Sequence, residues 1–423
     1  MLSIQFIRDH TDRVKSDLSR RNTTAPIDRI LDLDDTRRRL LQDVEALRAR
    51  RNAVSKEIGA AGKDAVARQA KIDEMRGVGD RIDVLDVDLK ATESDLNRLL
   101  LEVPNIIDPS VPDGPDESAN IVVETVGDLP KFDFVPKPHW ELGPDLGALD
   151  FERGVKMSGS RFFVMRAGLA RLHRALIQFF LNENIKAGFQ EHYLPYMLTE
   201  ASLFASGQLP KFRDNLYKDH EEDYFLIPTA EVAFVNLYRD EILPPGMLPL
   251  RYVAHTPCFR REKMAAGRDV RGIKRVHQFE KVEMFVYCEP DQSEREFQRL
   301  VTQARALIEM LGLTYRVLAL CSGDIGFNSA KTVDLEVWSP GAGEWLEVSS
   351  GSNCLDFQAH RANIRYRPAL DAGPRFPHLL NMSGLALPRM VVAVMENYQR
   401  EDGTIAVPEV LRPYMGTDVI GHA

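Results

Sequence analysis

The chain has 423 residues, of which 44% are hydrophobic and 28% are charged. This composition is that of a folded globular protein, and it excludes collagen-like, largely disordered and membrane-embedded classes. The chain has 54 lysine and arginine residues and 63 aspartate and glutamate residues, giving a net charge of −9. That charge argues against indiscriminate coating of nucleic acid but is compatible with a local basic surface.

The start of the chain and its cysteines predict a cytoplasmic protein with no membrane partner. No stretch approaches the ~20 apolar residues that cross a membrane. The first ten residues lack the basic start and apolar core of a signal peptide. The cysteines occur singly, at Cys258, Cys288, Cys321 and Cys354. Without a C-x-x-C pair, neither a disulfide framework nor a structural zinc site is expected.

Residues 36–103 have the pattern of two long helices joined in a hairpin. Proline and aromatic residues are nearly absent there, and the apolar residues recur with a period of about 3.5, which is typical of a coiled-coil seam. The segment 60–64 can reverse the chain between the helices. The seam residues are Leu40, Val44, Leu47, Val54 and Ile58, followed by Val78, Ile82, Leu85, Leu89, Leu96, Leu99 and Val103.

The two predicted helices differ in charge. The first is mainly basic and includes Arg48, Arg50 and Arg51, whereas the second is mainly acidic. The solvated surface of a coiled coil accounts for such charges, and so does a basic strip that contacts phosphates. Both interpretations remain open at this point.

A segment with four prolines at 104–115 is predicted to be a linker, because prolines interrupt a helix. Beyond it, helical patterns alternate irregularly with strand-like segments at 282–287 and 332–338, which favours an α+β fold with a largely antiparallel sheet. Ser293 and Glu296 are predicted to form a capping box at the start of a helix. Neither G-x-G-x-x-G nor a P-loop motif is present, so a Rossmann or P-loop nucleotide site is not supported.

Charged residues occupy strand positions that would face the interior of a sheet. On one predicted strand, alternation places Arg275, Phe279 and Glu283 on the same face. Arg260 and Glu347 lie in other strand-like segments. Arginines and carboxylates on one sheet suit a polyanionic ligand with its divalent metal. Salt bridges on an exposed sheet face would give the same pattern.

Several segments, taken together and in this order, resemble the bacterial-type seryl-tRNA synthetases, which are class II aminoacyl-tRNA synthetases. The resemblance covers essentially the whole chain. The segments are LDFER at 149–153, GQLPKF at 207–212, PTAEV at 228–232, TPCFRRE at 256–262 with GRD at 267–269, HQFEKVE at 277–283, SGLALPR at 383–389, ENYQ at 396–399 and PEVLRPYMG at 408–416.

This resemblance implies an N-terminal coiled-coil hairpin that binds tRNA, at 1–105, and a class II catalytic domain on a mainly antiparallel sheet, at 106–423. It implies ATP-dependent activation of L-serine to seryl-adenylate and transfer of serine to tRNA(Ser), with tRNA(Sec) as a further candidate. The expected cofactors are ATP, as substrate, and Mg²⁺, with no zinc. A homodimer is expected, and Arg48, Arg50 and Arg51 become candidates for tRNA contacts.

The resemblance also implies catalytic roles. Arg260 would hold the α-phosphate of ATP, Arg389 the γ-phosphate, and Glu347 with Ser350 the magnesium ion. The residues implied to bind serine are Thr229, Ala230, Glu231, Glu283 and Ser383. Those implied to bind ATP are Arg260, Arg261, Glu262, Val276, Phe279, Glu347, Val348, Ser349, Ser350 and Arg389.

The sequence departs from the family pattern in the motif-two loop, at 261–265, and near the expected serine site. Leu379 and Met382 are bulkier than the residues they replace, and Pro388 precedes the expected γ-phosphate arginine. A proline fits there if it opens a helix. The bulky residues predict a pocket of altered shape, which leaves open a specialised paralogue for antibiotic self-resistance or biosynthetic serine supply. A catalytically silent homologue that binds RNA or a partner is a further alternative.

Overall fold

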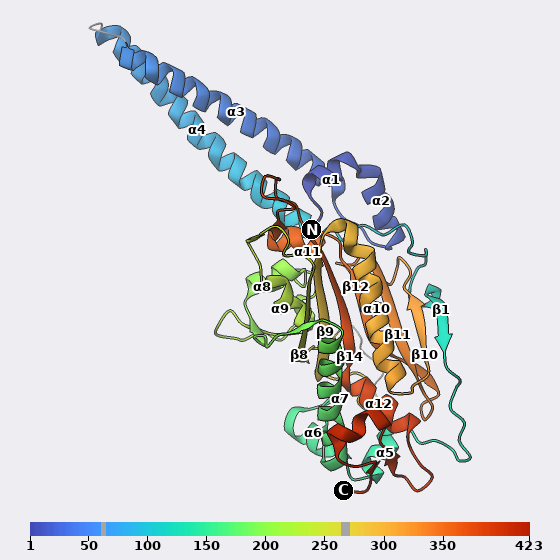
Figure 1. Cartoon of the computed structure of the whole chain (residues 1–423). Coiled ribbons are helices and arrows are strands. Elements are labelled where there is room, and N and C mark those ends of the chain that lie inside the picture. Colours follow the sequence, from blue (N-terminus) through green and yellow to red (C-terminus); the bar gives the residue numbers. More distant parts are fainter. Residues whose placement is uncertain (61–64, 264–270) are drawn as a thin grey trace. The chain divides into compact units, whose positions relative to one another are not determined.

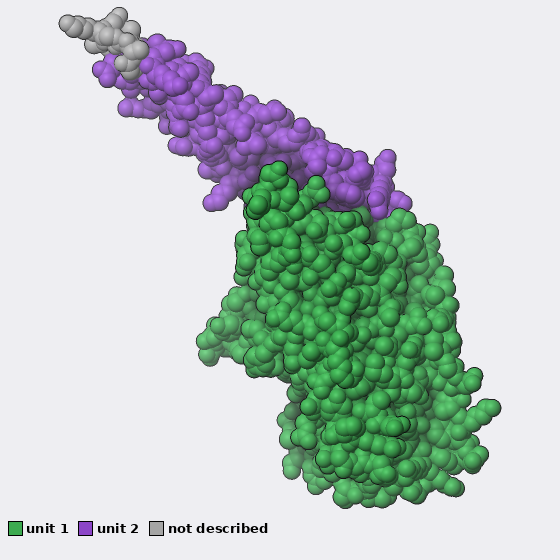
Figure 2. Space-filling view, viewed as in Figure 1, with its two compact units in different colours: residues 1, 20–22, 105–423 green, residues 2–19, 23–104 purple. Residues whose placement is uncertain are grey.

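The computed structural model describes residues 1–60, 65–263 and 271–423 (Figure 1). The described residues form two compact units (Figure 2). One unit comprises residues 2–19 and 23–104, and the other comprises residues 1, 20–22 and 105–423. Within the described part of the chain, no helix is both long enough and apolar enough to cross a membrane.

The smaller unit contains the predicted helical hairpin. Its helices are α1 Ile4–Asp9, α2 Thr11–Arg20, α3 Ile27–Ala60 and α4 Ala65–Leu100. The predicted seam is confirmed, because Val44, Val78, Ile82 and Leu96 are buried between the two long helices. The predicted reversal at 60–64 lies largely outside the described residues.

The first long helix begins nine residues earlier than the pattern predicted, at residue 27 rather than 36. Pro26 directly precedes it, and proline suits the start of a helix because the first N–H groups have no partner within the helix. Ile27, Ile30 and Leu33 are buried although they lie outside the seam. The short helices α1 and α2 were not predicted.

The larger unit is built on one eight-stranded sheet with the order β1-β10-β11-β12-β14-β9-β8-β4. Every pairing in it is antiparallel except that of β4 with β8, which confirms the predicted sheet. Its strands are β1 Ile121–Val126, β4 Gln190–Glu191, β8 Leu250–Phe259, β9 Gln278–Cys288, β10 Tyr315–Ala319, β11 Lys331–Ser339, β12 Glu344–Asn353 and β14 His378–Ala386.

The remaining elements are short strands in two-stranded pairs and the helices of the larger unit. The strands are β2 Leu149–Asp150, β3 Val164–Met165, β5 Met197–Leu198, β6 Phe225–Leu226, β7 Ile242–Leu243, β13 Arg365–Tyr366, β15 Ile405–Ala406 and β16 Val419–Ile420. The helices are α5 His139–Asp145, α6 Phe151–Ser158, α7 Ala167–Lys186, α8 Glu200–Ser206, α9 Ala230–Asn236, α10 Ser293–Met310, α11 Phe357–Ala362, α12 Leu387–Asn397 and α13 Arg412–Met415.

The two faces of the sheet are covered differently, as alternation along β9 shows. Val282, Met284 and Val286 join the main core beneath α7, α10 and α12 (Figure 1). Phe285 and Tyr287 point to the opposite face and pack in a second cluster with α8, α9 and α11. This second face also carries Phe279, Lys281 and Glu283, so the period of two along one strand separates the core from the site.

The predicted linker at 104–115 contains no helix, as its prolines predicted, and Ile107 and Val111 within it are buried in a cluster that includes Leu318 of β10. One local prediction was wrong in physical detail. The helix α10 begins at Ser293 as predicted, but without a capping box. The Ser293 hydroxyl instead accepts a hydrogen bond from Asn353 at 2.9 Å, and Glu296 binds Arg251 at 2.6 Å.

Candidate active site

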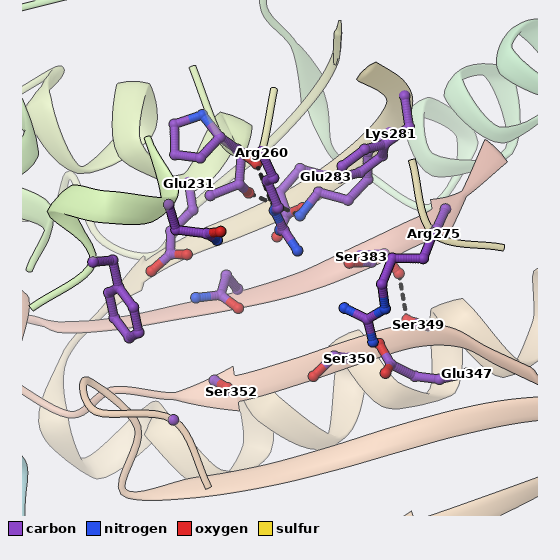
Figure 3. Close-up of a pocket in the computed structure, with 18 of the residues that line it drawn as sticks. Glu231, Arg260, Arg275, Lys281, Glu283, Glu347, Ser349, Ser350, Ser352 and Ser383 are labelled. Atoms are coloured by element: carbon purple, nitrogen blue, oxygen red, sulfur yellow. Dashed lines mark hydrogen bonds and ion pairs between the residues drawn. The ribbon is translucent and has the colours of Figure 1, made fainter. Parts of the chain in front are cut away.

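A cavity of about 600 Å³ opens on the second face of the sheet. All but two of the residues predicted for serine and ATP line it (Figure 3). These lining residues are Thr229, Glu231, Arg260, Glu262, Val276, Phe279, Glu283, Glu347, Val348, Ser349, Ser350, Ser383 and Arg389. They come from β9, β12 and β14, from the segment after β8, and from the beginnings of α9 and α12.

The two exceptions have clear positions. Ala230 is the first residue of α9 and is buried in the second cluster. Arg261 has an exposed side chain, and its backbone N–H donates to the carbonyl oxygen of Asn215 at 3.0 Å. Residues 264–270, which include the resembling segment 267–269 and the departures at 264 and 265, lie outside the described residues.

One end of the cavity holds a buried group of charges. The ammonium of Lys281 donates to the Thr229 hydroxyl at 2.8 Å and forms an ion pair with Glu283. Arg260 reaches this group from the segment after β8 (Figure 3). Its guanidinium carbon lies 5.2 Å from the centre of the Phe279 ring, a cation–π contact.

Lys281 had no predicted role, although it lies between Phe279 and Glu283 in the alternation and so had to share their face. The signal was therefore present in the sequence. What the sequence did not show was its partner, the Thr229 hydroxyl, which lies 52 residues away along the chain.

Glu231 is the most perturbed carboxyl group of this end. Burial and the neighbouring Glu283 raise the pKa of Glu231 from 4.5 to about 7. A hydrogen bond from the Gln358 amide to Oε1 of Glu231, at 2.5 Å, opposes that shift, as do the charges of Lys281 and Arg260. Because its pKa lies near 7, this carboxyl group ionises readily beside a cation, so it is suited to pairing with an ammonium group that enters the cavity.

The other end of the cavity is lined by cations and carboxylates closer to solvent. Nη1 of Arg389 donates to the carbonyl oxygen of Glu347 at 2.6 Å and lies 3.4 Å from its carboxylate. Nη1 of Arg275 binds Oε2 of Glu262 at 2.8 Å. Arg275 and Glu347 extend toward one another from opposite walls (Figure 3). Cations in this arrangement suit a polyphosphate.

Two further features shape the lined wall of the cavity. The Ser349 hydroxyl donates to the carbonyl oxygen of Ser383 at 2.5 Å and so joins β12 to β14. Pro388 lies in the first turn of α12, where its missing N–H costs nothing, as expected.

Asp334 is a buried carboxyl group beneath this end that was not predicted. It pairs with Ser350 in the register of β11 and β12. Burial and the charge of Glu347 raise the pKa of Asp334 well above its usual value. Its Oδ1 has no hydrogen-bond partner among the described residues.

The predicted effect of Met382 and Leu379 on the serine pocket is wrong. Met382 points away from Ser383 along β14 and is buried in the main core opposite Gly351. A Cβ atom on Gly351 would lie 2.8 Å from the Met382 sulfur, so the thioether fills the space that this glycine leaves. Leu379 is buried in the second cluster. Neither residue lines the cavity, so the motivation for a resistance paralogue is lost.

The predicted basic strip is partly neutralised. Arg48 forms an ion pair with Asp86 at 2.7 Å, and Arg50 forms one with Glu74. All three arginines of the strip, Arg51 included, are exposed. Exposed pairs of this kind are weak and exchange readily, so the strip remains available to phosphates.

Within residues 1–60, 65–263 and 271–423, there is no cluster of three or more His, Cys, Asp and Glu side chains that could hold a metal ion. Glu347 and Ser350 offer a carboxylate and a hydroxyl oxygen beside the polyphosphate end of the cavity. Mg²⁺ prefers such oxygen ligands and is usually held by one or two carboxylates together with substrate phosphates.

Two family models match the chain. Residues 1–107 match the seryl-tRNA synthetase N-terminal domain, and residues 212–398 match the tRNA synthetase class II core domain (G, H, P, S and T). A serine–tRNA ligase of Thermomicrobium roseum is 58% identical over 419 residues, covering 98% of this chain and 94% of that protein. A serine–tRNA ligase of Roseiflexus sp. strain RS-1 is 56% identical and covers 98% of each chain.

A solved structure has the same fold over its full length. The seryl-tRNA synthetase from Pyrococcus horikoshii, complexed with ATP, superposes with a TM-score of 0.94 at 37% identity, covering 100% of both chains.

Proposed function

The chain belongs to the seryl-tRNA synthetase family and is an ATP-dependent serine–tRNA ligase of class II, and from this premise we propose that the cavity on the second face of the sheet forms seryl-adenylate. The observation that carries the proposal is that Arg260 and Glu231 lie with the buried pair of Lys281 and Glu283 in one group at the end of this cavity. Their charges complement those of an amino acid that reacts with a phosphate.

Serine binds at the end that contains Thr229, Glu231, Glu283 and Ser383. Glu231 pairs with the ammonium group, since it is a buried carboxyl whose neighbours only partly offset its burial. Glu283, Thr229 and Ser383 form hydrogen bonds to the serine hydroxyl. A site built to bind a hydroxyl rejects alanine, because the buried polar groups would then lose their partner.

ATP binds along the rest of the cavity wall. The adenine ring lies between Phe279 and Val276, with Glu262 at its edge, and Arg389 holds the γ-phosphate. The Pyrococcus horikoshii relative was solved in complex with ATP, which supports ATP as the substrate of this cavity. Ser349 and Val348 form part of the cavity wall and provide no charge. The Ser349 hydroxyl already donates to the carbonyl oxygen of Ser383 on β14.

Glu347 and Ser350 hold a magnesium ion that neutralises the phosphates of ATP when it is bound. The donor set fits, because both side chains provide oxygen atoms at the edge of the cavity. Glu347 is accessible there, with 47% of its side chain exposed.

The chemistry is an in-line displacement at the α-phosphorus. A carboxylate oxygen of serine forms a bond to phosphorus, the bond to the bridging oxygen of the β-phosphate breaks, and pyrophosphate leaves with that electron pair. Arg260 stabilises the charge that develops on the α-phosphate. Such a reaction depends on positioning and on charge neutralisation rather than on a protein base.

The N-terminal residues 1–105 bind tRNA(Ser), and tRNA(Sec) as well, while residues 106–423 form the catalytic domain. The match of residues 1–107 to the N-terminal domain of the family supports this division. The exposed arginines Arg48, Arg50 and Arg51 contact tRNA phosphates.

The active molecule is a cytoplasmic homodimer. The strand β1 supports dimerisation, because it lies at the edge of the sheet and exposes Ile121, Val122 and Val123. An exposed apolar edge strand is a liability in a monomer and is commonly covered by a partner.

Serine-dependent exchange of pyrophosphate into ATP tests the proposed site. The purified protein should catalyse exchange with magnesium, and Arg260→Ala should lower kcat/KM by about 100- to 1,000-fold. Arg260→Lys keeps the charge and serves as the matched control, with a smaller loss. Exchange by Arg260→Ala within a few-fold of wild type would remove Arg260 from the mechanism. Absence of exchange in the wild type would favour a catalytically silent homologue.

A further inference from the structure

Arg260 and His277 face each other just beyond the last paired residues of β8 and β9. That pairing ends at Phe259 and Gln278. One residue further on, the backbone N–H of Arg260 donates to the carbonyl oxygen of His277 at 2.9 Å. Arg260 lines the cavity, whereas the described lining residues do not include His277. His277 can therefore act on Arg260 without contact with a substrate.

The side chain of His277 forms a second bond to the same residue. Its Nδ1 lies 3.0 Å from the carbonyl oxygen of Arg260. Because a carbonyl oxygen only accepts hydrogen bonds, Nδ1 carries the proton and donates this bond. Both polar groups of the Arg260 backbone are thus bonded to one residue, the N–H to its main chain and the carbonyl oxygen to its imidazole.

Two aromatic side chains adjoin the imidazole of His277. Its ring centre lies 5.4 Å from that of Phe162, and the two ring planes are inclined by 37°. The ring centre of Tyr217 lies 6.3 Å away, with its plane inclined by 83°. Aromatic pairs at such distances prefer inclined and edge-to-face arrangements, so these neighbours stabilise one orientation of the imidazole.

The residue before Phe162 holds the same loop from another side. The carbonyl oxygen of Arg161 accepts a hydrogen bond from the backbone N–H of His277 at 3.4 Å, and its Nη1 donates to the carbonyl oxygen of Glu262 at 3.4 Å. Arg161 has a φ of +64°, a left-handed conformation that a residue other than glycine keeps only where its surroundings impose it. The chain on both sides of Arg260 is therefore fixed.

The backbone of Arg260 sets the direction of its guanidinium group. Nε donates to the carbonyl oxygen of Pro228 at 3.2 Å, and the guanidinium carbon lies 5.2 Å from the centre of the Phe279 ring. Rotation of the backbone at Arg260 would move the whole side chain relative to these two contacts. A displacement of about 1 Å in a group that acts on the transition state can slow a reaction by about 100-fold.

We propose that His277 is a positioning residue for adenylate formation, because its imidazole holds the carbonyl oxygen of Arg260 and so directs the guanidinium to the α-phosphate. This inference rests on the function proposed for the cavity. The imidazole transfers no proton and touches no substrate. Since Arg260 stabilises charge that develops in the transition state, loss of the bond from His277 should lower kcat and change the KM values for serine and ATP little.

The test measures serine-dependent pyrophosphate exchange by the full-length protein. His277→Phe keeps a ring beside Phe162 and Tyr217 but removes the donor, and it should lower kcat by about 10- to 100-fold with both KM values within about threefold of wild type. His277→Asn loses the ring but places an amide N–H close to the position of Nδ1. It should restore kcat to within about threefold of wild type.

His192 provides a matched control away from the cavity. Its Nδ1 lies 3.1 Å from the carbonyl oxygen of Gln190, and its ring centre lies 4.2 Å from that of Tyr252. His192→Phe therefore removes the same kind of bond and keeps the same kind of ring contact. It should leave exchange unchanged.

A double variant shows whether His277 acts through Arg260. In the Arg260→Ala background, His277→Phe should change kcat by less than about twofold, because no guanidinium is left to position. Losses that multiply in the double variant would overturn the proposal. So would exchange by His277→Phe within threefold of wild type, or a His277→Asn variant that unfolds in urea like wild type yet exchanges no better than His277→Phe. Absence of exchange in the wild type would instead refute the function proposed for the cavity.

Discussion

His139 and Glu396 form a fully buried pair in which Nδ1 of the imidazole lies 2.8 Å from Oε1 of the carboxylate. The backbone N–H of Ile273 donates to Nε2 of the same ring at 3.1 Å. Because Nε2 accepts this bond, Nδ1 carries the proton and donates it to Glu396. The imidazole therefore joins the last turn of α12 to the segment that precedes Lys274.

The first turn of the same helix holds that segment at a second point. Nε of Arg389 donates to the carbonyl oxygen of Lys274 at 3.2 Å. Gly272, with a φ of +71°, has no room for a side chain, since a Cβ atom would lie 1.8 Å from Nε2 of His139. Contacts from both ends of α12 therefore fix the segment before β9, from which Arg275 and Val276 face the cavity.

Glu396→Gln should therefore destabilise the protein and weaken ATP binding. Burial opposes ionisation, but hydrogen bonds from His139 and Ser339 lower the pKa of Glu396 below its usual value of 4.5. The resulting stability is present above pH 4.5 and is lost as the pH falls through the lowered pKa. We expect the variant to lose about 2–4 kcal/mol of unfolding free energy at pH 7, measured by urea denaturation.

The same variant should raise the KM for ATP more than the KM for serine, because Arg275 and Val276 lie at the ATP end. Glu401→Gln, at an exposed turn, is the control and should change neither quantity. An unchanged urea midpoint together with an unchanged KM for ATP in Glu396→Gln would show that the buried pair does not hold this segment.

The second prediction concerns the pH dependence of serine binding. The pKa of Glu231 is raised to about 7, so its carboxyl group is mostly protonated at pH 6 and mostly ionised at pH 8. Only the ionised form pairs with the serine ammonium. The KM for serine should therefore fall about tenfold from pH 6 to pH 8, measured by exchange at saturating ATP.

In Glu231→Gln, the glutamine side chain has nearly the shape of glutamate but does not titrate. It should raise the KM for serine and remove this pH dependence. The raised pKa also means that Glu231 contributes stability below pH 4.5 that is lost as the pH rises toward 7, so the variant should flatten that part of the stability profile. A pH profile of Glu231→Gln identical to that of wild type would assign the titration to another group.

The third prediction follows from the position of Met382 in the core. Met382→Ala should cost about 2–5 kcal/mol of unfolding free energy, because it opens a cavity opposite Gly351. The KM for serine and inhibition by a bulky seryl-adenylate analogue should remain within about twofold of wild type. Met157→Ala, whose side chain is exposed, is the control for stability. If Met382→Ala became more sensitive to the analogue than wild type, Met382 would have to lie in the serine pocket.

Periodicity predicted those parts of the fold that repeat locally. The seam positions Val44 and Ile82 follow from a 3.5-residue period, and the cavity face of β9 follows from a period of two through Phe279 and Glu283. The same alternation, applied to β14, places Met382 and Ser383 on opposite faces. Neighbours along a strand therefore serve different surroundings, and Met382 packs in the core while Ser383 lines the cavity.

The remaining site residues depend on contacts between distant segments. Gln358 binds Glu231 across 127 residues, and Asn328 packs on Gly207. Asp334 lies beside Ser350 because β11 pairs with β12 in this register. Nothing in the residues near these positions marks them, because their partners are fixed by the register of the sheet and by the packing of loops.

The last prediction concerns the basic strip of α3. Arg48 and Arg50 each have an acidic partner on α4, so tRNA must compete with Asp86 and Glu74 for them. Replacing Arg48, Arg50 and Arg51 together with glutamine should weaken tRNA(Ser) binding and reduce the slope of log Kd against log salt by up to about one for each phosphate that the protein no longer neutralises. Replacing the partners instead, by Asp86→Asn with Glu74→Gln, removes the competition and should tighten binding. Because all these groups are exposed, either set should change the unfolding free energy by less than about 1 kcal/mol for each pair. Filter binding at several salt concentrations measures both effects. If the arginine and the partner variants bind tRNA with the affinity and salt slope of wild type, the charges of the hairpin serve only to solvate it.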